Sequence, residues 1–211
     1  MNLTLMKPSR RVIAFVAVSA ALWITVPAWA QAPGPDGMIR ELSSEVLSRI
    51  KADASIRAGD VGKVLALVEA TVMPHVDGGR MTASAVGRFW RTATPQQRKR
   101  LEAEFMQLVL RTYAGALTHV EDQTVQVMPI RAAADDLQAV IKTVVRGTDN
   151  PVHVDYRLAN TPEGWKIYDV NLLGVWLTQI YRSSFAHEID VGGIDGLIST
   201  LAEKNRSNRG K

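Results

Sequence analysis

The chain has 211 residues, of which 46% are hydrophobic and 22% are charged, and it contains no cysteine. This length fits one domain, or one domain with a small helical appendage. The absence of cysteine excludes disulfide bonds and cysteine-ligated metal sites, so burial of a core must supply the stability.

The first thirty residues have the three parts of a cleavable export signal. Lys7, Arg10 and Arg11 form a basic start, residues 12–26 are apolar, and Ala28-Trp29-Ala30 is a small-residue cleavage pattern. The apolar run of about fifteen residues is shorter than the ~20 that a membrane-spanning helix needs. We therefore expect cleavage after Ala30. The paired arginines give a partial twin-arginine pattern, but such pairs are common in export signals, so the general secretory (Sec) route is expected over the twin-arginine (Tat) route.

Removal of this segment leaves an almost neutral chain. The segment holds three basic and no acidic residues, so 22 basic and 21 acidic residues remain. The basic footprint of a nucleic-acid-binding protein is therefore lacking. Residues 31–37, rich in proline and glycine, are typical of a linker, and the basic residues 205–211 of a disordered tail. The folded domain is expected to span residues 38–204.

Residues 38–117 follow a helical period. Apolar residues recur at helical spacing over residues 38–59, 61–74 and 81–91. Residues 95–117 give the clearest helix: Thr94 is placed at the N-cap, Pro95 at the first helical position, and Gln97 where it can complete a capping box. Helices thus come first along the chain.

After His119 the apolar period falls from about 3.6 residues to 2. This alternation predicts strands near residues 125–127, 137–145, 152–158 and 165–172, and the intervening turns at 148–151 and 160–164 are short enough to make neighbouring strands antiparallel. Helices are expected over residues 175–187 and 194–201. The sequence predicts an α+β fold in a single domain, a twisted antiparallel sheet of about four strands covered by helices.

No motif for catalysis or metal binding emerges. The four histidines lack the spacings of zinc ligands. A nucleophile elbow, a reactive thiol and a phosphate-binding loop are also lacking. Only His75 with Asp77, and His187 near a helix end, suggest a hydrolase, which we keep as the less favoured alternative. We expect a protein that is not an enzyme and needs no metal.

Residues 164–185 (GWKIYDVNLLGVWLTQIYRSSF) are too apolar for a loop, and they introduce a family resemblance. Residues 164–170, the pair Gly174-Val175, residues 181–185 and residues 193–198 resemble the C-terminal signature of the MlaC, or toluene-tolerance, family. Its N-terminal half is matched in the same order by residues 73–77, 81–82, 87–91, 97, 105 and 111–114. The resemblance covers about residues 40–205. The chain departs from the family at Gly78, where an aromatic residue is common, and at Leu173 and Trp176, where Glu and Ser are usual.

The resemblance implies a periplasmic phospholipid carrier. Its body would be a cone-like, nuclear-transport-factor-like (NTF2-like) α+β domain with an apolar cavity between sheet and helices. It would carry glycerophospholipid between the inner-membrane Mla ABC transporter complex and an outer-membrane lipoprotein–porin complex, as the system's auxiliary component, and so support outer-membrane lipid asymmetry. We expect a monomer that touches these complexes transiently and has the phospholipid as cargo in place of a cofactor. Gly78 and Trp176 leave a sterol-like or hopanoid cargo as an alternative.

The apolar residues of the motifs are the candidates for the cavity lining. Exposing two acyl chains of about fifteen carbons each would cost on the order of 20 kcal/mol, so the lipid needs an apolar enclosure. Arg182, the charged residue within the motif, is expected to meet a phosphate at the cavity mouth or to pair with an acidic neighbour such as Asp169. The expected lining residues are Phe89, Trp90, Phe105, Leu108, Val109, Tyr113, Val144, Tyr156, Tyr168, Val170, Val175, Trp176, Ile180 and Tyr181.

Overall fold

The computed structural model describes residues 33–120, 122–130, 136–147 and 150–208. The expected export signal at residues 1–30 lies outside the described residues. From Ala32 onward the chain forms one compact unit. Within the described residues, no helix combines the length and apolar character needed to cross a membrane.

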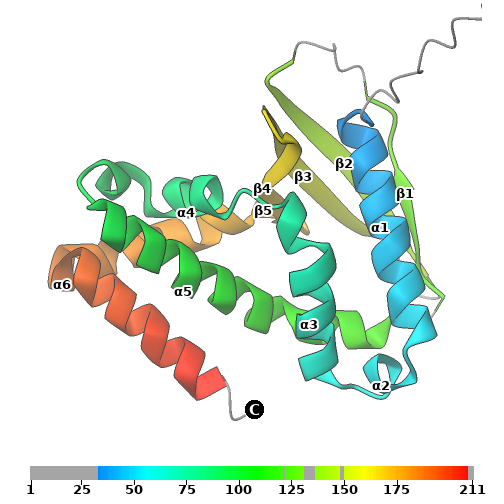
Figure 1. The fold of residues 1–211 in the computed structure, drawn as a ribbon, viewed down its shortest axis with the longest axis horizontal. Coiled ribbons are helices and arrows are strands. Elements are labelled where there is room, and N and C mark those ends of the chain that lie inside the picture. The colour runs from blue at the N-terminus through cyan, green and yellow to red at the C-terminus, as the bar shows by residue number, and fades with distance from the viewer. Residues whose placement is uncertain (1–32, 121, 131–135, 148–149, 209–211) are drawn as a thin grey trace, which may run out of the picture. The chain divides into compact units, whose positions relative to one another are not determined.

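The N-terminal half is helical, as predicted (Figure 1). Its α-helices are α1 (Pro35–Ala52), α2 (Ala54–Arg57), α3 (Val61–Thr71), α4 (Gly78–Val86) and α5 (Pro95–Ala114), and its 3-10 turns are η1 (Met73–His75), η2 (Gly87–Arg91) and η3 (Gly115–His119). The capping box of α5 is confirmed. The Gln97 amide donates to Thr94 Oγ1 over 3.2 Å, and the Thr94 amide donates to Gln97 Oε1 over 3.0 Å.

Two boundaries at the start of the chain differ from the prediction. Helix α1 begins at Pro35, so residues 35–37 are not linker: proline suits a first helical position because its missing N–H has no helical partner to lose. The helix predicted over residues 38–59 is broken at Asp53. The Asp53 carboxylate accepts hydrogen bonds from the amides of Ser55 and Ile56 and so caps a new helix, α2.

The C-terminal half contains a five-stranded antiparallel sheet, one strand more than predicted. Its strands β1 (Thr124–Val127), β2 (Gln138–Arg146), β3 (Val152–Thr161), β4 (Gly164–Leu172) and β5 (Val175–Trp176) lie in sequence order. The additional strand is β5. Val175 and Trp176 pair with Leu172 and Asn171, so the helix that we expected to start at Val175 starts at Leu177.

A single long helix, α6 (Leu177–Ser207), replaces the two helices predicted near the C-terminus. It is kinked at Gly193, whose φ of 67° is not helical. It also extends into the predicted tail, because Asn205 is buried and donates to the backbone oxygen of Glu104 at 2.9 Å and to its Oε2 at 2.7 Å. The predicted tail is therefore helical over residues 205–207.

Helix α1 covers one face of the sheet (Figure 1). Ile39 and Leu42 of α1 pack there with Ile141 of β2 and with Leu158 and Ile167 of the neighbouring strands. We call this side, marked by Ile141, the inner face of the sheet. Positions opposite one another in a sheet share a face, so the register tells which other side chains lie on it.

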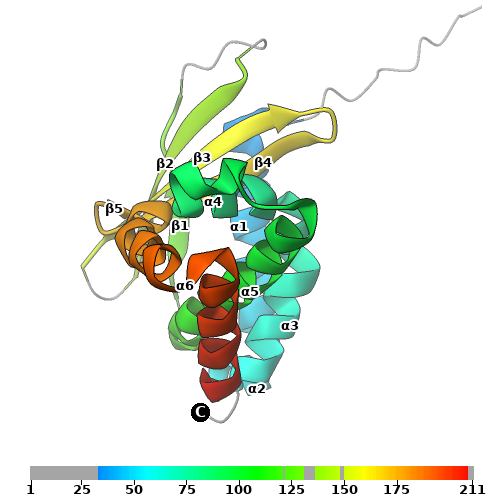
Figure 2. The same cartoon turned by 90° about the vertical axis from the view of Figure 1, so that its left-hand side faces the viewer.

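Helix α5 is the centre of the helical layer. One of its sides packs with α4 and α6 in a cluster that contains Leu101, Phe105 and Leu201, and another packs with α3 through Val64 and Ala114. Figure 2 shows the C-terminal part of α6 running alongside α5. At the centre of the first cluster, the Phe105 ring lies edge-on to the rings of Tyr181 and Phe185, at centroid distances of 5.1 and 5.2 Å.

The turn between β4 and β5 holds a leucine in an unfavourable backbone conformation. Leu173 has φ 53° and Gly174 has φ 90°, and these two residues alone connect the paired residues Leu172 and Val175. Positive φ at both central positions is the pattern of a type I′ turn, which strongly favours Asn-Gly. The Leu173 side chain is 78% exposed, so burial offers little compensation.

Leu173→Asn is therefore expected to stabilise the protein by about 1 kcal/mol, because asparagine tolerates positive φ better than leucine. For a domain of this size, thermal denaturation should show a melting temperature about 2–4 °C higher. Leu173→Ala keeps the conformational cost and serves as the control, with a melting temperature near that of the wild type. An unchanged or lower melting temperature for Leu173→Asn would show that the turn is not strained.

Candidate functional site

The candidate lining residues of the helical layer separate by burial. Phe105 and Leu108 are buried and enclosed by protein atoms, so they belong to the core of the first cluster. The other candidates of the helical layer keep part of their surface exposed. Those that pack on this cluster are Phe89, Trp90, Val109 and Tyr181, and Tyr113 lies on α5. The half-buried members are the better candidates for contact with a ligand.

The candidates on the sheet divide between its two faces. Tyr156 lies opposite Ile141 and Val170 lies opposite Tyr156, so both share the inner face, and both are half-buried. Val175, paired with Leu172, continues this face at the sheet edge and is exposed, as is Ile180 in the first turn of α6. The structure brings these sheet residues together on the side covered by helices.

Val144, Trp176 and Tyr168 lie elsewhere. Val144 is three residues from Ile141 in β2, so it points to the opposite, outer face. The row of paired residues Trp176, Asn171, Asp155 and Lys142 also lies on the outer face. Tyr168 has no cross-strand partner, because the register shifts there, and its hydroxyl donates to Gln138 over 2.8 Å. Val144 and Trp176 therefore lie on the opposite face of the sheet from Tyr156 and Val170.

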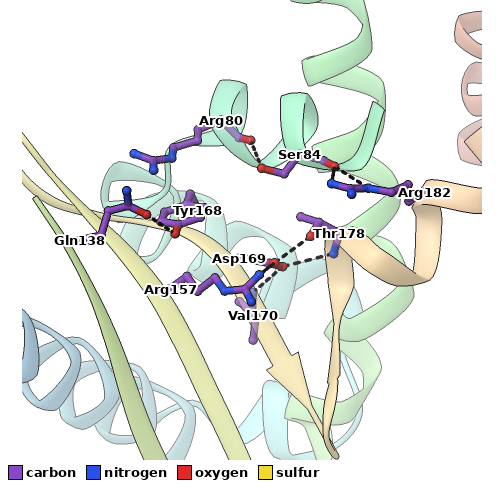
Figure 3. A network of polar contacts seen from close by, with 9 residues as sticks. All are labelled: Arg80, Ser84, Gln138, Arg157, Tyr168, Asp169, Val170, Thr178 and Arg182. Atoms are coloured by element: carbon purple, nitrogen blue, oxygen red, sulfur yellow. Dashed lines mark hydrogen bonds and ion pairs between the residues drawn. The ribbon is translucent and has the colours of Figure 1, made fainter. Parts of the chain in front are cut away.

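A buried carboxylate fixes the corner where β4 leads into α6 (Figure 3). Asp169 is 1% exposed and accepts hydrogen bonds from Arg157 Nη1 (3.1 Å), Thr178 Oγ1 (2.7 Å), the Thr178 amide (3.2 Å) and the Val170 amide (3.0 Å). The Arg157 guanidinium also lies 3.7 Å from the centroid of the Trp176 ring. Trp176 thus covers a structural ion pair, and the pairing of Arg157 with Asp169 was missed because it depends on strand register.

Arg182 does not pair with Asp169, contrary to one of the two expectations for it. Its Nε and Nη2 donate to the backbone oxygen of Ser84 over 3.2 and 2.6 Å, as Figure 3 shows. Arg182 therefore joins α6 to α4.

Two of the candidate tyrosines remain neutral well above neutral pH. Burial raises the pKa of Tyr156 to about 12, with a smaller upward effect from Asp155 and an opposing hydrogen bond with Thr143. Burial also raises the pKa of Tyr181, with Tyr113 adding to the shift and a hydrogen bond with Thr112 opposing it. Both side chains therefore offer hydroxyl groups without adding charge to apolar surroundings.

Gly78, one of the departures from the family pattern, makes room for Glu102 rather than for a ligand. A Cβ at Gly78 would lie 2.9 Å from Glu102 Oε1 and 3.2 Å from Met106 Cγ. The space of a larger side chain is thus already filled by α5. Burial raises the pKa of Glu102, and the neighbouring Asp77 carboxylate adds to this effect.

Glu102→Gln is expected to raise the melting temperature at pH 7. Since the folded-state pKa of Glu102 is raised, the protonated form favours folding below the usual pKa of 4.5, and this contribution is lost as the pH rises through the raised value. The advantage of the glutamine variant should therefore shrink as the pH falls from the raised pKa to 4.5, and should not change further below 4.5. Thermal melts across this pH range test it, with Glu69→Gln on the exposed side of α3 as the control. A difference that is independent of pH would contradict the expectation.

The residues that suggested a hydrolase lie on separate elements. His75 is in η1 and half-buried, whereas His187 is in α6 and exposed. In the part of the chain that the structure describes, no group of three or more His, Cys, Asp or Glu residues is placed to hold a metal ion.

The fold and the site define the class of protein. It is an α+β domain in which the inner face of one antiparallel sheet packs against helices, and both the sheet and the helices carry half-buried apolar residues. The chain belongs to the MlaC family, whose model, described as MlaC protein, matches residues 40–203. The predicted resemblance is thereby confirmed over nearly the same range.

Individual relatives agree with this assignment. The chain is 25% identical over 163 residues to the toluene tolerance protein ttg2D of Pseudomonas putida, covering 76% of this chain and 75% of the relative. It is 22% identical over 207 residues to the intermembrane phospholipid transport system binding protein MlaC of Haemophilus influenzae, covering 96% and 95%. A solved structure of the phospholipid-binding protein from Ralstonia solanacearum, in complex with a phospholipid, is 40% identical with a TM-score of 0.79, covering 84% of this chain and 99% of that one.

Proposed function

We propose that this protein is a periplasmic phospholipid carrier that holds the acyl chains of a glycerophospholipid between its sheet and its helices. The observation that carries the proposal is the similarity to the Ralstonia solanacearum protein, which was solved with a phospholipid bound and which this chain matches over 99% of that protein's length. Membership of the MlaC family supports the same function.

The half-buried apolar side chains give the proposal a physical basis. Tyr156 and Val170 on the inner face, and Val109, Tyr113 and Tyr181 on α5 and α6, each keep surface that protein atoms do not cover. Acyl chains would cover this surface and gain about 0.8 kcal/mol for each methylene withdrawn from water. Because the chains leave one hydrocarbon environment for another, the net transfer from membrane to protein is close to neutral. The lipid can then be both taken up and released.

The carrier would exchange lipid with the inner-membrane Mla ABC transporter complex and with an outer-membrane lipoprotein–porin complex, and so support the asymmetry of the outer membrane. The name of the Haemophilus influenzae relative, a binding protein of an intermembrane phospholipid transport system, supports this part of the proposal. An export signal at residues 1–30 would place the protein in the periplasm. The carrier would act as a monomer, without catalytic residues, metal or cofactor.

Identification of the bound lipid tests the proposal. The full chain is expressed with its own first thirty residues in a Gram-negative host, purified from the periplasm and extracted with organic solvent for mass spectrometry. Glycerophospholipid at close to one molecule per protein is the expected result. A sterol-like or hopanoid lipid would replace the proposed cargo, and an empty extract together with no uptake from labelled phospholipid vesicles would refute the carrier function.

A larger side chain at Val170 is expected to compete with the acyl chains. Overpacking of a filled apolar site costs about 1–3 kcal/mol, so Val170→Trp should lower phospholipid affinity about tenfold or more. The matched control is Val140→Trp. Val140 is 47% exposed, and its position next to Ile141 in β2 puts it on the outer face. Uptake from vesicles containing fluorescent phospholipid measures the effect, and equal uptake by the two variants would remove Val170 from the lining.

A further inference from the structure

One stretch of the chain concentrates positive charge. Residues 78–101, which form α4, η2 and the first turns of α5, contain six basic residues and no acidic residue. We call this stretch the basic segment. Its basic residues are Arg80, Arg88, Arg91, Arg98, Lys99 and Arg100. Since the chain after residue 30 is almost neutral, this charge is segregated rather than general.

Most of these charged side chains are exposed to solvent, and ion pairs neutralise little of their charge. The Arg88 side chain is 74% exposed, and Arg91, Lys99 and Arg100 are exposed as well. Among the ion pairs of the described residues, the segment takes part in one, between Arg88 and Asp190 at 3.9 Å, which is exposed and neutralises little charge. Three other carboxylates border the segment: Asp77 at the Arg80 amide, Glu102 beside Gly78, and Asp195 at the Gln97 side chain. A further cation lies beside the segment, because Arg182 Nε is 4.0 Å from where a Cβ on Gly87 would stand.

The basic segment lacks the apolar centre of a protein–protein interface. Stable interfaces have an apolar core from which charged residues are depleted. In this fully described stretch, none of the large hydrophobic side chains is exposed. Phe89 and Trp90 are half-buried against the first cluster, and the guanidinium groups of Arg88 and Arg98 lie over their rings at 4.7 and 5.4 Å. Aromatic rings with cationic groups above them suit the boundary between an apolar phase and water.

We infer that the basic segment docks the protein on the anionic lipid headgroups of a bilayer surface. Headgroup phosphates supply the complementary charge. Because the phosphates form a flat array, the protein can bind them without an apolar pocket. Each basic residue near an anionic bilayer strengthens binding about fivefold. The inference rests on the proposed function, since a lipid carrier gains by resting on the membrane that holds a complex with which it exchanges lipid. The contact is with headgroups, whereas the acyl chains of the cargo would lie between the sheet and the helices.

Vesicle sedimentation tests the inference with the purified protein. The probes are vesicles of phosphatidylethanolamine with phosphatidylglycerol, and vesicles of phosphatidylcholine alone. The variant combines Arg88→Gln, Arg91→Gln, Lys99→Gln and Arg100→Gln. The control combines Arg40→Gln, Arg57→Gln, Lys142→Gln and Arg146→Gln, which are also exposed and change the net charge equally. Circular dichroism melts establish that both variants are folded.

The wild type is expected to bind the anionic vesicles and not the phosphatidylcholine vesicles, with affinity that falls as salt rises. The basic-segment variant should bind about a hundredfold more weakly or worse, and the control should stay within about tenfold of the wild type. Absence of wild-type binding, or equal loss in both variants, overturns the inference. Unchanged vesicle binding in the variant, with loss of binding to an acidic protein, assigns the surface to a protein partner and also overturns it.

The same preparations separate this inference from the carrier function. Phospholipid that co-purifies with each variant is extracted and quantified before vesicles are added. A wild-type extract without phospholipid contradicts the carrier function. Wild-type protein that contains phospholipid but does not bind anionic vesicles contradicts the docking surface alone.

Discussion

Replacing Asp169 by alanine is expected to destabilise the protein by about 3–5 kcal/mol, because it removes one partner of a buried ion pair. Thr178 would lose the acceptor of both its amide and its hydroxyl, and Arg157 would lose its only salt-bridge partner among the described residues. The Arg157 side chain is 33% exposed and can regain part of its hydration, which favours the lower end of this range.

Thermal and urea denaturation measure this effect, with a fall in melting temperature of roughly 6–12 °C expected for about 3 kcal/mol. Asp169→Asn keeps the size and one acceptor oxygen, so its loss should be intermediate. Asp155→Ala is the control, because Asp155 is only half-buried on the neighbouring strand. A loss for Asp169→Ala no larger than that of the control would mean that the corner is held by other contacts.

Phe105→Ala is expected to destabilise the protein by about 3–5 kcal/mol, since it empties the centre of the first cluster. Phe105 is 0% exposed, and two aromatic rings contact it edge-on at centroid distances near 5 Å. Urea denaturation measures the loss. Ile180→Ala, at an exposed position in α6, is the control and should cost less than about 1 kcal/mol.

The same position separates core from lining. Phe105→Leu keeps most of the apolar volume, and Phe105 is enclosed by protein atoms, so phospholipid bound per folded protein should equal that of the wild type. A marked loss of phospholipid in this variant, with the fold intact, would return Phe105 to the lining.

Local chemistry made most of the fold predictable. Thr94, Pro95 and Gln97 define the start of α5 through contacts within four residues, and the alternation of β3 and β4 depends only on the chain's own period. Strand β5 was missed because Val175 and Trp176 are too few to show alternation and run directly into an apolar helix. The helical tail was missed because Asn205 is fixed by Glu104, about a hundred residues earlier in the chain.

The site was less predictable, because the strand register decides on which face of the sheet a side chain lies. Register puts Tyr156 and Val170 on one face, but Val144 lies in a run with apolar residues on both sides of the strand, where alternation gives no direction. Tyr168 occupies the register shift in β4, which reverses the inward and outward order that its neighbours predict. The partnership of Arg157 with Asp169 likewise becomes visible only when β3 and β4 are aligned.

The part of α6 beyond Gly193 completes a cluster that begins far earlier in the chain. Leu197, Ile198 and Leu201 close the cluster around Leu101 and Phe105 of α5. Without this part of α6, the apolar side of α5 has no cover. Because the contact joins distant segments and requires the closure of a long loop, we expect it to form late in folding.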